Sequence, residues 1–188
     1  MNNPLRILQT LDRHLTKPAE ITIFGRAALA LGFQNSHPSF ATTRDVDAIL
    51  PLQWLQAADE NLDFWQAQQK TNAELDAEGL YITHLFRELE IILTPDWLMK
   101  RMSLPLKLTR LSVFRPSTLD LILTKMMRGD DNDLADIRFL LTQEPHIAEE
   151  LKAAFGRARL PDVPEIHELF LAAQTKVLEI AGSFRSQT

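Results

Sequence analysis

One ten-residue stretch constrains the fold more than any other part of the chain. Residues 41–50 read Ala-Thr-Thr-Arg-Asp-Val-Asp-Ala-Ile-Leu, and a proline follows them. The apolar and β-branched residues of this stretch favour extended backbone, and its length is typical of a strand. Because alternate side chains of a strand share a face, Asp45 and Asp47 point to the same side. The opposite face, which we expect in a core, carries Val46, Ala48 and Leu50.

The two carboxylates lie close enough to repel each other. Alternate residues of a strand are roughly 7 Å apart at Cα, so Asp45 and Asp47 are destabilised unless a cation lies between them. A hard divalent cation such as Mg²⁺ prefers carboxylate oxygens and suits this spacing. The alternative is an edge strand whose charged face is simply solvated.

A second motif lies upstream of this strand. Residues 21–24 form a short apolar run, Gly25 follows, and residues 27–31 have the composition of a helix that Gly32 ends. A glycine between a strand and a helix lets the backbone approach a ligand closely. The start of the helix presents N–H groups and the positive end of a dipole, which favour phosphate.

The order strand, glycine, helix and Asp-x-Asp strand resembles the nucleotidyltransferase superfamily that includes DNA polymerase beta. In particular it resembles minimal nucleotidyltransferases of the bacterial group related to abortive-infection toxins. The resemblance spans roughly residues 18–142. Its motifs here are Gly-Arg-Ala-Ala-Leu at 25–29, Ala-Thr-Thr-Arg-Asp-Val-Asp at 41–47, and a lysine helix with an acidic turn at 125–136.

The resemblance implies a metal-dependent nucleotidyltransferase. It would move NMP from an NTP to a hydroxyl acceptor on RNA, tRNA included, or on protein, and release pyrophosphate. Asp45 and Asp47 would hold magnesium, with two ions in the active site. The fold places a third carboxylate on a neighbouring strand, for which Glu90 is the candidate. Glu88, nearer the turn, is the alternative.

Further residues are implied by the resemblance to bind nucleotide. Lys125 interrupts the apolar run 119–127, where a lysine needs a partner or must extend to water. Lys125 and the following arginine would neutralise phosphate charge, and the two aspartates beyond them would orient this pair; capping and a salt bridge are the alternatives. The full set is Gly25, Arg26, Thr43, Lys125, Arg128, Asp133 and Asp136, with Lys125 also catalytic.

Arg26 departs from the family pattern, which has a second glycine or serine at this position. This departure supports an alternative function, a non-catalytic module that binds nucleotide or a partner through the same fold. A third hypothesis is a member of a toxin–antitoxin system that contacts a cognate toxin or antitoxin through its C-terminal helices.

The whole pattern predicts an α+β fold with a small mixed sheet of four or five strands. We expect a nucleotidyltransferase-like core at 1–115 and a helical C-terminal segment at 116–188. Residues 80–86 and 89–93 are predicted to form a hairpin, and residues 52–70 one long helix. The apolar share of 45% is sufficient for a core.

Composition also excludes several classes of protein. No run of about 18 apolar residues is present, so we expect no membrane span. The absence of cysteine excludes thiolate metal sites and disulfides, and we expect a cytoplasmic protein. A net charge of −5 argues against broad binding to nucleic acid.

Overall fold

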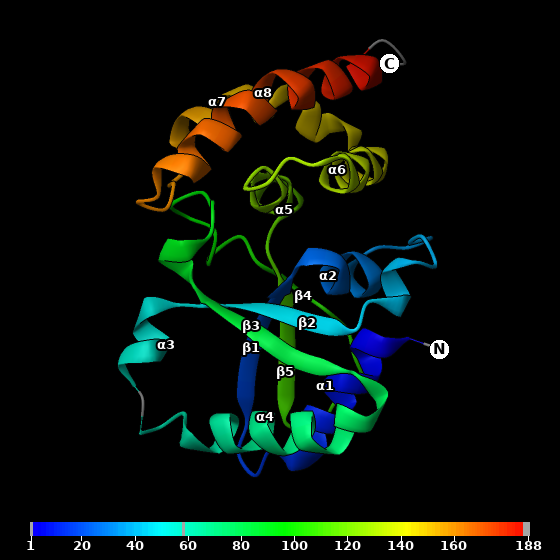
Figure 1. The fold of residues 1–188 in the computed structure, drawn as a ribbon, viewed down its shortest axis with the longest axis vertical. Coiled ribbons are helices and arrows are strands. Elements are labelled where there is room, and N and C mark those ends of the chain that lie inside the picture. The colour runs from blue at the N-terminus through cyan, green and yellow to red at the C-terminus, as the bar shows by residue number, and fades with distance from the viewer. Residues whose placement is uncertain (1, 58, 186–188) are drawn as a thin grey trace. The chain divides into compact units, whose positions relative to one another are not determined.

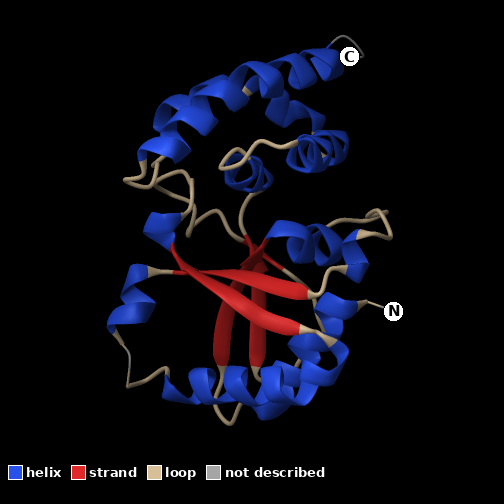
Figure 2. Cartoon of the chain, in the orientation of Figure 1, coloured by secondary structure: helices blue, strands red, loops and turns tan. Residues whose placement is uncertain are grey.

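The chain forms an α+β structure with a five-stranded mixed sheet and a helical C-terminal region, as the sequence predicts (Figures 1 and 2). The computed structural model describes residues 2–57 and 59–185. The chain is divided into two compact units. The first comprises Met1–Glu88 and Arg101–Arg115, and the second comprises Leu89–Lys100 and Pro116–Thr188.

The first unit contains the sheet. Its order is β3-β2-β1-β5-β4, with β1 antiparallel to β2 and parallel to β5, β2 parallel to β3, and β4 antiparallel to β5. The strands are β1 (Ala19–Phe24), β2 (Asp45–Leu50), β3 (Tyr81–Arg87), β4 (Met102–Ser103) and β5 (Leu111–Arg115). The helices are α1 (Asn3–His14), α2 (Gly25–Gly32), α3 (Leu52–Gln56), α4 (Leu62–Leu75) and the short 3-10 helices η1 (Phe40–Thr42) and η2 (Asp76–Glu78).

Strand β2 has the two faces that its alternation predicts. Val46, Ala48 and Leu50 are buried, while Asp45 and Asp47 are half-buried. Strand β2 lies between β1 and β3, so its backbone is paired on both sides. A shift of one residue in either pairing would turn both carboxylates into the core, and their desolvation therefore fixes the register.

Helix α1 forms because Asn2 caps its first turn and its apolar residues recur at helical spacing. The Asn2 side chain accepts a hydrogen bond from Leu5 N, and Ile7, Leu8 and Leu11 are fully buried. Helix α1 packs against α4, and α4 in turn packs against β3. Helix α2 packs against β1 and β2, which brings the start of α2 to the strand that carries the two aspartates.

The prediction of one helix over residues 52–70 is wrong. The chain forms α3 and α4 instead, and Asn61 lies between them. The Asn61 amide donates hydrogen bonds to the carbonyls of Trp54, at 2.6 Å, and Ala57, at 3.0 Å. These side-chain bonds stabilise the turn between the two helices, because an asparagine amide competes with the backbone for helical carbonyls.

The predicted hairpin of 80–86 and 89–93 is also wrong. Strand β3 forms, but a 3-10 helix, η3 (Glu88–Glu90), follows it instead of a second strand. The Glu88 carboxylate accepts a hydrogen bond from Leu52 N at 3.1 Å. Residues 91–93 are all buried and belong to the second unit, where Leu93 forms a bridge with Arg159. Three consecutive buried side chains cannot line one face of a hairpin strand.

The second unit consists mainly of helices. Ser117 caps the first of them by accepting a hydrogen bond from Asp120 N. Among the helices the structure describes, none is both long and apolar enough to cross a membrane. The helices are α5 (Thr118–Lys125), α6 (Asp131–Gln143), η4 (Pro145–Glu149), α7 (Leu151–Arg157) and α8 (Pro164–Arg185).

Asp12 ties α1 to the start of β5. Its carboxylate accepts hydrogen bonds from Thr109 N, at 3.0 Å, Arg110 N, at 2.7 Å, and Leu111 N, at 2.8 Å. Burial raises the pKa of Asp12, but the three N–H donors and the charge of Arg110 outweigh burial, so this pKa lies below its ordinary value. The ionised carboxylate therefore stabilises the folded state.

The Asp12→Asn variant should lower the free energy of unfolding at pH 7 by about 2–3 kcal/mol, since charge-assisted hydrogen bonds are lost. A lowered folded pKa contributes stability that is complete above the unfolded pKa, about 3.9, and is lost as pH falls through the folded value. The difference between wild type and variant should therefore shrink from pH 5 downwards in urea titrations. Asp162→Asn, at an exposed aspartate, is the control. A difference independent of pH would contradict this role of the Asp12 charge.

Candidate functional site

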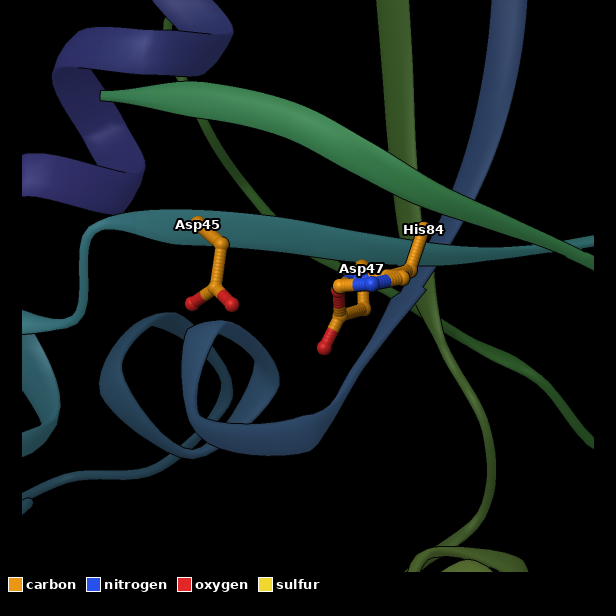
Figure 3. Close-up of side chains that lie close together, drawn as sticks. All are labelled: Asp45, Asp47 and His84. Atoms are coloured by element: carbon orange, nitrogen blue, oxygen red, sulfur yellow. The ribbon is translucent and has the colours of Figure 1, made fainter. Parts of the chain in front are cut away.

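Strand β2 presents Asp45 and Asp47 on the same side, towards the ribbon of α2 (Figure 3). Thr43, just before the strand, donates a hydrogen bond from its hydroxyl to Asp45 Oδ1 at 2.6 Å. This bond orients the first carboxylate and occupies one of its lone pairs. The other oxygens retain capacity to bind a cation, because an ionised carboxylate has about four acceptor positions.

Gly25 lies beside the second carboxylate. It has φ +63°, and a Cβ at this position would be 3.4 Å from Asp47 Oδ2. The register explains the approach, because Phe24 pairs with Asp47 across the β1–β2 ladder and the chain turns into α2 at the next residue. A side chain at position 25 would strain the backbone and cover one side of the Asp47 carboxylate.

The start of α2 is a candidate anion site. Phe24 precedes the helix and makes no capping hydrogen bond with its side chain, so a side chain from the N-cap position does not occupy the first N–H groups. Arg26, the second residue of α2, is half-buried and already engaged in an interaction. Arg26 therefore follows directly after the glycine turn that lies beside Asp47.

His84, which the sequence analysis did not select, lies against the pair of aspartates. Its Nδ1 is 3.0 Å from Asp47 Oδ1, and one ligand atom from each of Asp45, Asp47 and His84 lies within 4.8 Å of the others. Figure 3 shows the His84 ring extending from β3 to the carboxylate of Asp47. This is a cluster of two carboxylates and one imidazole that could hold a metal ion.

A β-bulge explains the direction of His84. The β2–β3 register changes between Val46 and Ala48, so that Thr83 and His84 together oppose Asp47. Both residues of the bulge are exposed, whereas Ile82 before them is buried. A sequence signal existed, because two adjacent polar residues interrupt the alternation of this strand, and bulges commonly redirect side chains beside functional sites.

The lysine and arginine of the predicted nucleotide site lie in the second unit and pair with its aspartates. Lys125 Nζ is 2.6 Å from Asp136 Oδ2 and 3.3 Å from Asp133 Oδ1, and all three residues are buried. Arg128 donates from Nε and Nη2 to the two oxygens of Asp133, at 3.0 and 3.1 Å. Lys125 therefore does not extend to water. We call these four residues the lysine–aspartate cluster, whose formal charge is zero.

The start of α6 holds this cluster in place. Asp130 is the N-cap and accepts a hydrogen bond from Asp133 N at 2.9 Å, so Asp133 is one turn inside the helix and not its cap. The pKa of Asp130 is lowered, chiefly by this backbone N–H. Gly129, at φ +61°, makes the turn between α5 and α6. The turn brings Lys125 and Asp136 together from two helices.

Glu90, the predicted third carboxylate, lies in η3 and not on a strand beside the aspartates. It belongs to the second unit, whereas Asp45 and Asp47 belong to the first. The strand that was expected to carry Glu90 therefore does not form. Glu88, the alternative, is in the first unit but bonds to Leu52 N.

The donor set of the Asp45, Asp47 and His84 cluster suits a divalent cation. Carboxylate oxygens are the ligands that Mg²⁺ prefers, and an imidazole nitrogen is accepted by Mn²⁺ and later transition metals. The Asp47 side chain is 26% exposed and that of His84 is 61% exposed. The cluster is thus open enough to admit an ion together with phosphate or water.

Comparison with known proteins identifies one family. The model of the family DUF6036, described as a nucleotidyltransferase of unknown function, matches residues 5–144 of the chain. The matched residues include Gly25, Asp45, Asp47 and His84, and also the lysine–aspartate cluster. No curated protein and no solved structure gives a significant match.

The Gly25→Ala variant should lose about 1–2 kcal/mol of unfolding free energy, because alanine must adopt a left-handed backbone. Gly79→Ala is a matched control, with φ +65° and only the Arg44 guanidinium 3.7 Å from the added methyl. We expect similar stability losses in urea titrations of the two variants. Calorimetry should show weaker Mn²⁺ binding in Gly25→Ala alone. Equal Mn²⁺ affinities in the two variants would separate the Gly25 turn from the metal cluster.

The Lys125→Met variant should be destabilised by about 3–5 kcal/mol, because it leaves buried carboxylates without their ammonium partner. Lys152→Met, at an exposed lysine of α7, is the matched control and should change stability by less than about 0.5 kcal/mol. Urea titrations of both variants measure the difference. A Lys125→Met protein as stable as the control would show that the cluster does not stabilise the second unit.

Proposed function

Because this chain belongs to the DUF6036 family of nucleotidyltransferases, we propose that it transfers NMP from an NTP to a hydroxyl acceptor. The acceptor oxygen attacks the α-phosphorus, the bond from that phosphorus to the bridging oxygen of the β-phosphate breaks, and pyrophosphate leaves. The observation that carries the proposal is the pair of carboxylates on one face of β2, adjacent to the glycine turn that opens α2.

Asp45 and Asp47 would hold magnesium in this reaction, with two ions in the active form. The carboxylate oxygens of both residues suit Mg²⁺. One ligand atom from each of Asp45, Asp47 and His84 lies within 4.8 Å of the other two. When bound there, the metal would stabilise negative charge on the attacking and leaving oxygens. Thr43 orients the Asp45 carboxylate through its hydroxyl, at 2.6 Å, so that this oxygen need not reorganise when a ligand arrives.

The first turn of α2 would bind the triphosphate. Its N–H groups and helix dipole favour an anion, and the glycine at its start leaves space beside Asp47. Arg26, the second residue of α2, would add a positive charge next to this turn. Lys125, Arg128, Asp133 and Asp136 stay predictions as nucleotide-binding residues. Their mutual ion pairs support the narrower proposal that the aspartates orient the two cations.

Arg26 also supports a second candidate, a module with this fold that binds nucleotide without transferring it. A guanidinium at the second residue of α2 can occupy the position of a phosphate as well as bind one. We propose RNA or protein as the acceptor. We also propose a cognate toxin or antitoxin as a partner.

The test of the proposal is transfer of label. The purified chain is incubated with each α-labelled NTP, Mg²⁺ and either total RNA or protein, and incorporation is measured together with NTP binding. Incorporation supports the nucleotidyltransferase. Binding without incorporation supports the non-catalytic module.

Asp45→Asn and Asp47→Asn should each reduce transfer by on the order of 10²–10³-fold, comparable to the loss of a charge-stabilising group in other active sites. Both should retain the wild-type free energy of unfolding or exceed it, since each removes one of two repelling charges. Glu165→Gln, at an exposed residue of α8, controls for the change from carboxylate to amide. Unfolding of either aspartate variant, with transfer by its folded fraction unchanged, would make these residues structural.

A further inference from the structure

We infer that His84 is the third protein ligand of the metal held by Asp45 and Asp47, and that it shifts the metal preference of the site from Mg²⁺ towards Mn²⁺. The inference rests on the proposed function for the presence of a metal. It goes beyond that function in assigning a nitrogen ligand, where the family resemblance implies a third carboxylate.

The spacing of the cluster is that of neighbouring ligands. In an octahedral site with metal–ligand bonds of about 2.1 Å, adjacent ligand atoms are about 3.0 Å apart and opposite ones about 4.2 Å apart. His84 Nδ1 and Asp47 Oδ1 are 3.0 Å apart, and the complete set of three ligand atoms lies within 4.8 Å. The His84–Asp47 pair thus already has the separation of adjacent ligands, and the 4.8 Å limit on the whole set is about 0.6 Å above the separation of opposite ligands.

The imidazole is held in this position by its neighbours. The His84 ring stacks on Phe86, with centroids 5.7 Å apart and planes 21° apart. Phe86 in turn meets Phe24 edge to face, with centroids 5.6 Å apart. Because Phe24 is the residue before Gly25, this row of three rings connects the glycine turn to the imidazole. An aromatic support restricts the ring although its outer side is exposed.

The backbone that carries His84 is also fixed. Strand β3 is an edge strand, and α4 covers its outer side with two amides. The Asn72 side chain accepts from Ile82 N at 2.8 Å and donates to Ile82 O at 2.9 Å, and Gln68 donates to the same carbonyl at 2.8 Å. These bonds clamp the residue that precedes the bulge. The bulge then directs His84 to the side of the aspartates.

The chemistry of the ligand determines the preference. Mg²⁺ binds oxygen and retains its waters, whereas imidazole favours transition metals. Two carboxylates and one imidazole still accept Mg²⁺, but they favour Mn²⁺ more than three carboxylates would. The nitrogen can bind directly when the ring proton is on Nε2, because Nδ1 then offers its lone pair to the ion.

The experiment measures metal binding to the 188-residue chain without nucleotide. Calorimetry gives the affinities for Mn²⁺ and Mg²⁺, and pulsed electron paramagnetic resonance of bound Mn²⁺ detects a directly coordinated ¹⁴N nucleus. The variants are His84→Asp, which replaces nitrogen with a carboxylate, and Asp47→Asn, which tests the location of the ion. His146→Gln, at an exposed histidine of the second unit, is the matched control.

We expect a ¹⁴N coupling in wild type and in His146→Gln, and its loss in His84→Asp. The ratio of Mn²⁺ to Mg²⁺ affinity should fall by about tenfold in His84→Asp, which is the order of effect seen when the surroundings of a metal site are altered. The wild-type spectrum tests the ligand even if a variant does not fold, because coordination without any ¹⁴N coupling overturns the inference.

The outcomes separate this inference from the proposed function. Mn²⁺ that binds through Asp47 but shows no ¹⁴N coupling overturns the role of His84 and leaves the nucleotidyltransferase intact. A ¹⁴N coupling that His84→Asp removes supports the role of His84, even where the labelled-NTP assay shows no transfer. Absence of Mn²⁺ binding, or binding unaffected by Asp47→Asn, overturns the inference, and the labelled-NTP assay then decides the proposed function by itself.

Discussion

The central constraint of this structure is that β2 must be buried on one face and charged on the other. Val46 and Ala48 are fully buried, while the aspartates on either side of Val46 must avoid the core. A shift of one residue against β1 would violate both requirements, and the observed register pairs Phe24 with Asp47. The turn at Gly25 therefore lies beside a carboxylate as a consequence of hydrophobic burial, before any ligand is considered.

In contrast to β2, which keeps its charges out of the core, the second unit buries charged side chains. Two aspartates, a lysine and an arginine together carry no net charge, and their hydrogen bonds satisfy groups that are almost inaccessible to water. Such networks contribute little net stability compared with apolar packing, but the loss of one member is costly. The side chain of Arg128 is 71% exposed and that of Asp133 is 2% exposed. Arg128 is therefore the solvent-exposed member of this pair.

The sequence was sufficient for the features that follow from local patterns. Three such features are present in the structure: the alternation of β2, the glycine at the start of α2 and the need of Lys125 for a partner. Each can be predicted from neighbours within a few residues or one helix turn. His84 was missed because a bulge changes the parity of β3, and parity is what a strand argument relies on. Glu90 was selected because the family fold places a carboxylate on a neighbouring strand. That strand does not form, since residues 91–93 are all buried and Leu93 bridges to Arg159, far along the chain.

The division of the chain affects the order in which it folds during synthesis. The first unit is interrupted by Leu89–Lys100, which belong to the second unit, and is completed by Arg101–Arg115. Strand β1 has β2 on one side and β5 on the other, so until residue 115 has emerged from the ribosome β1 is an unpaired edge. A nascent chain in which β1 and β2 have already paired would therefore expose the backbone N–H and C=O groups along the edge of β1 that β5 covers in the complete first unit.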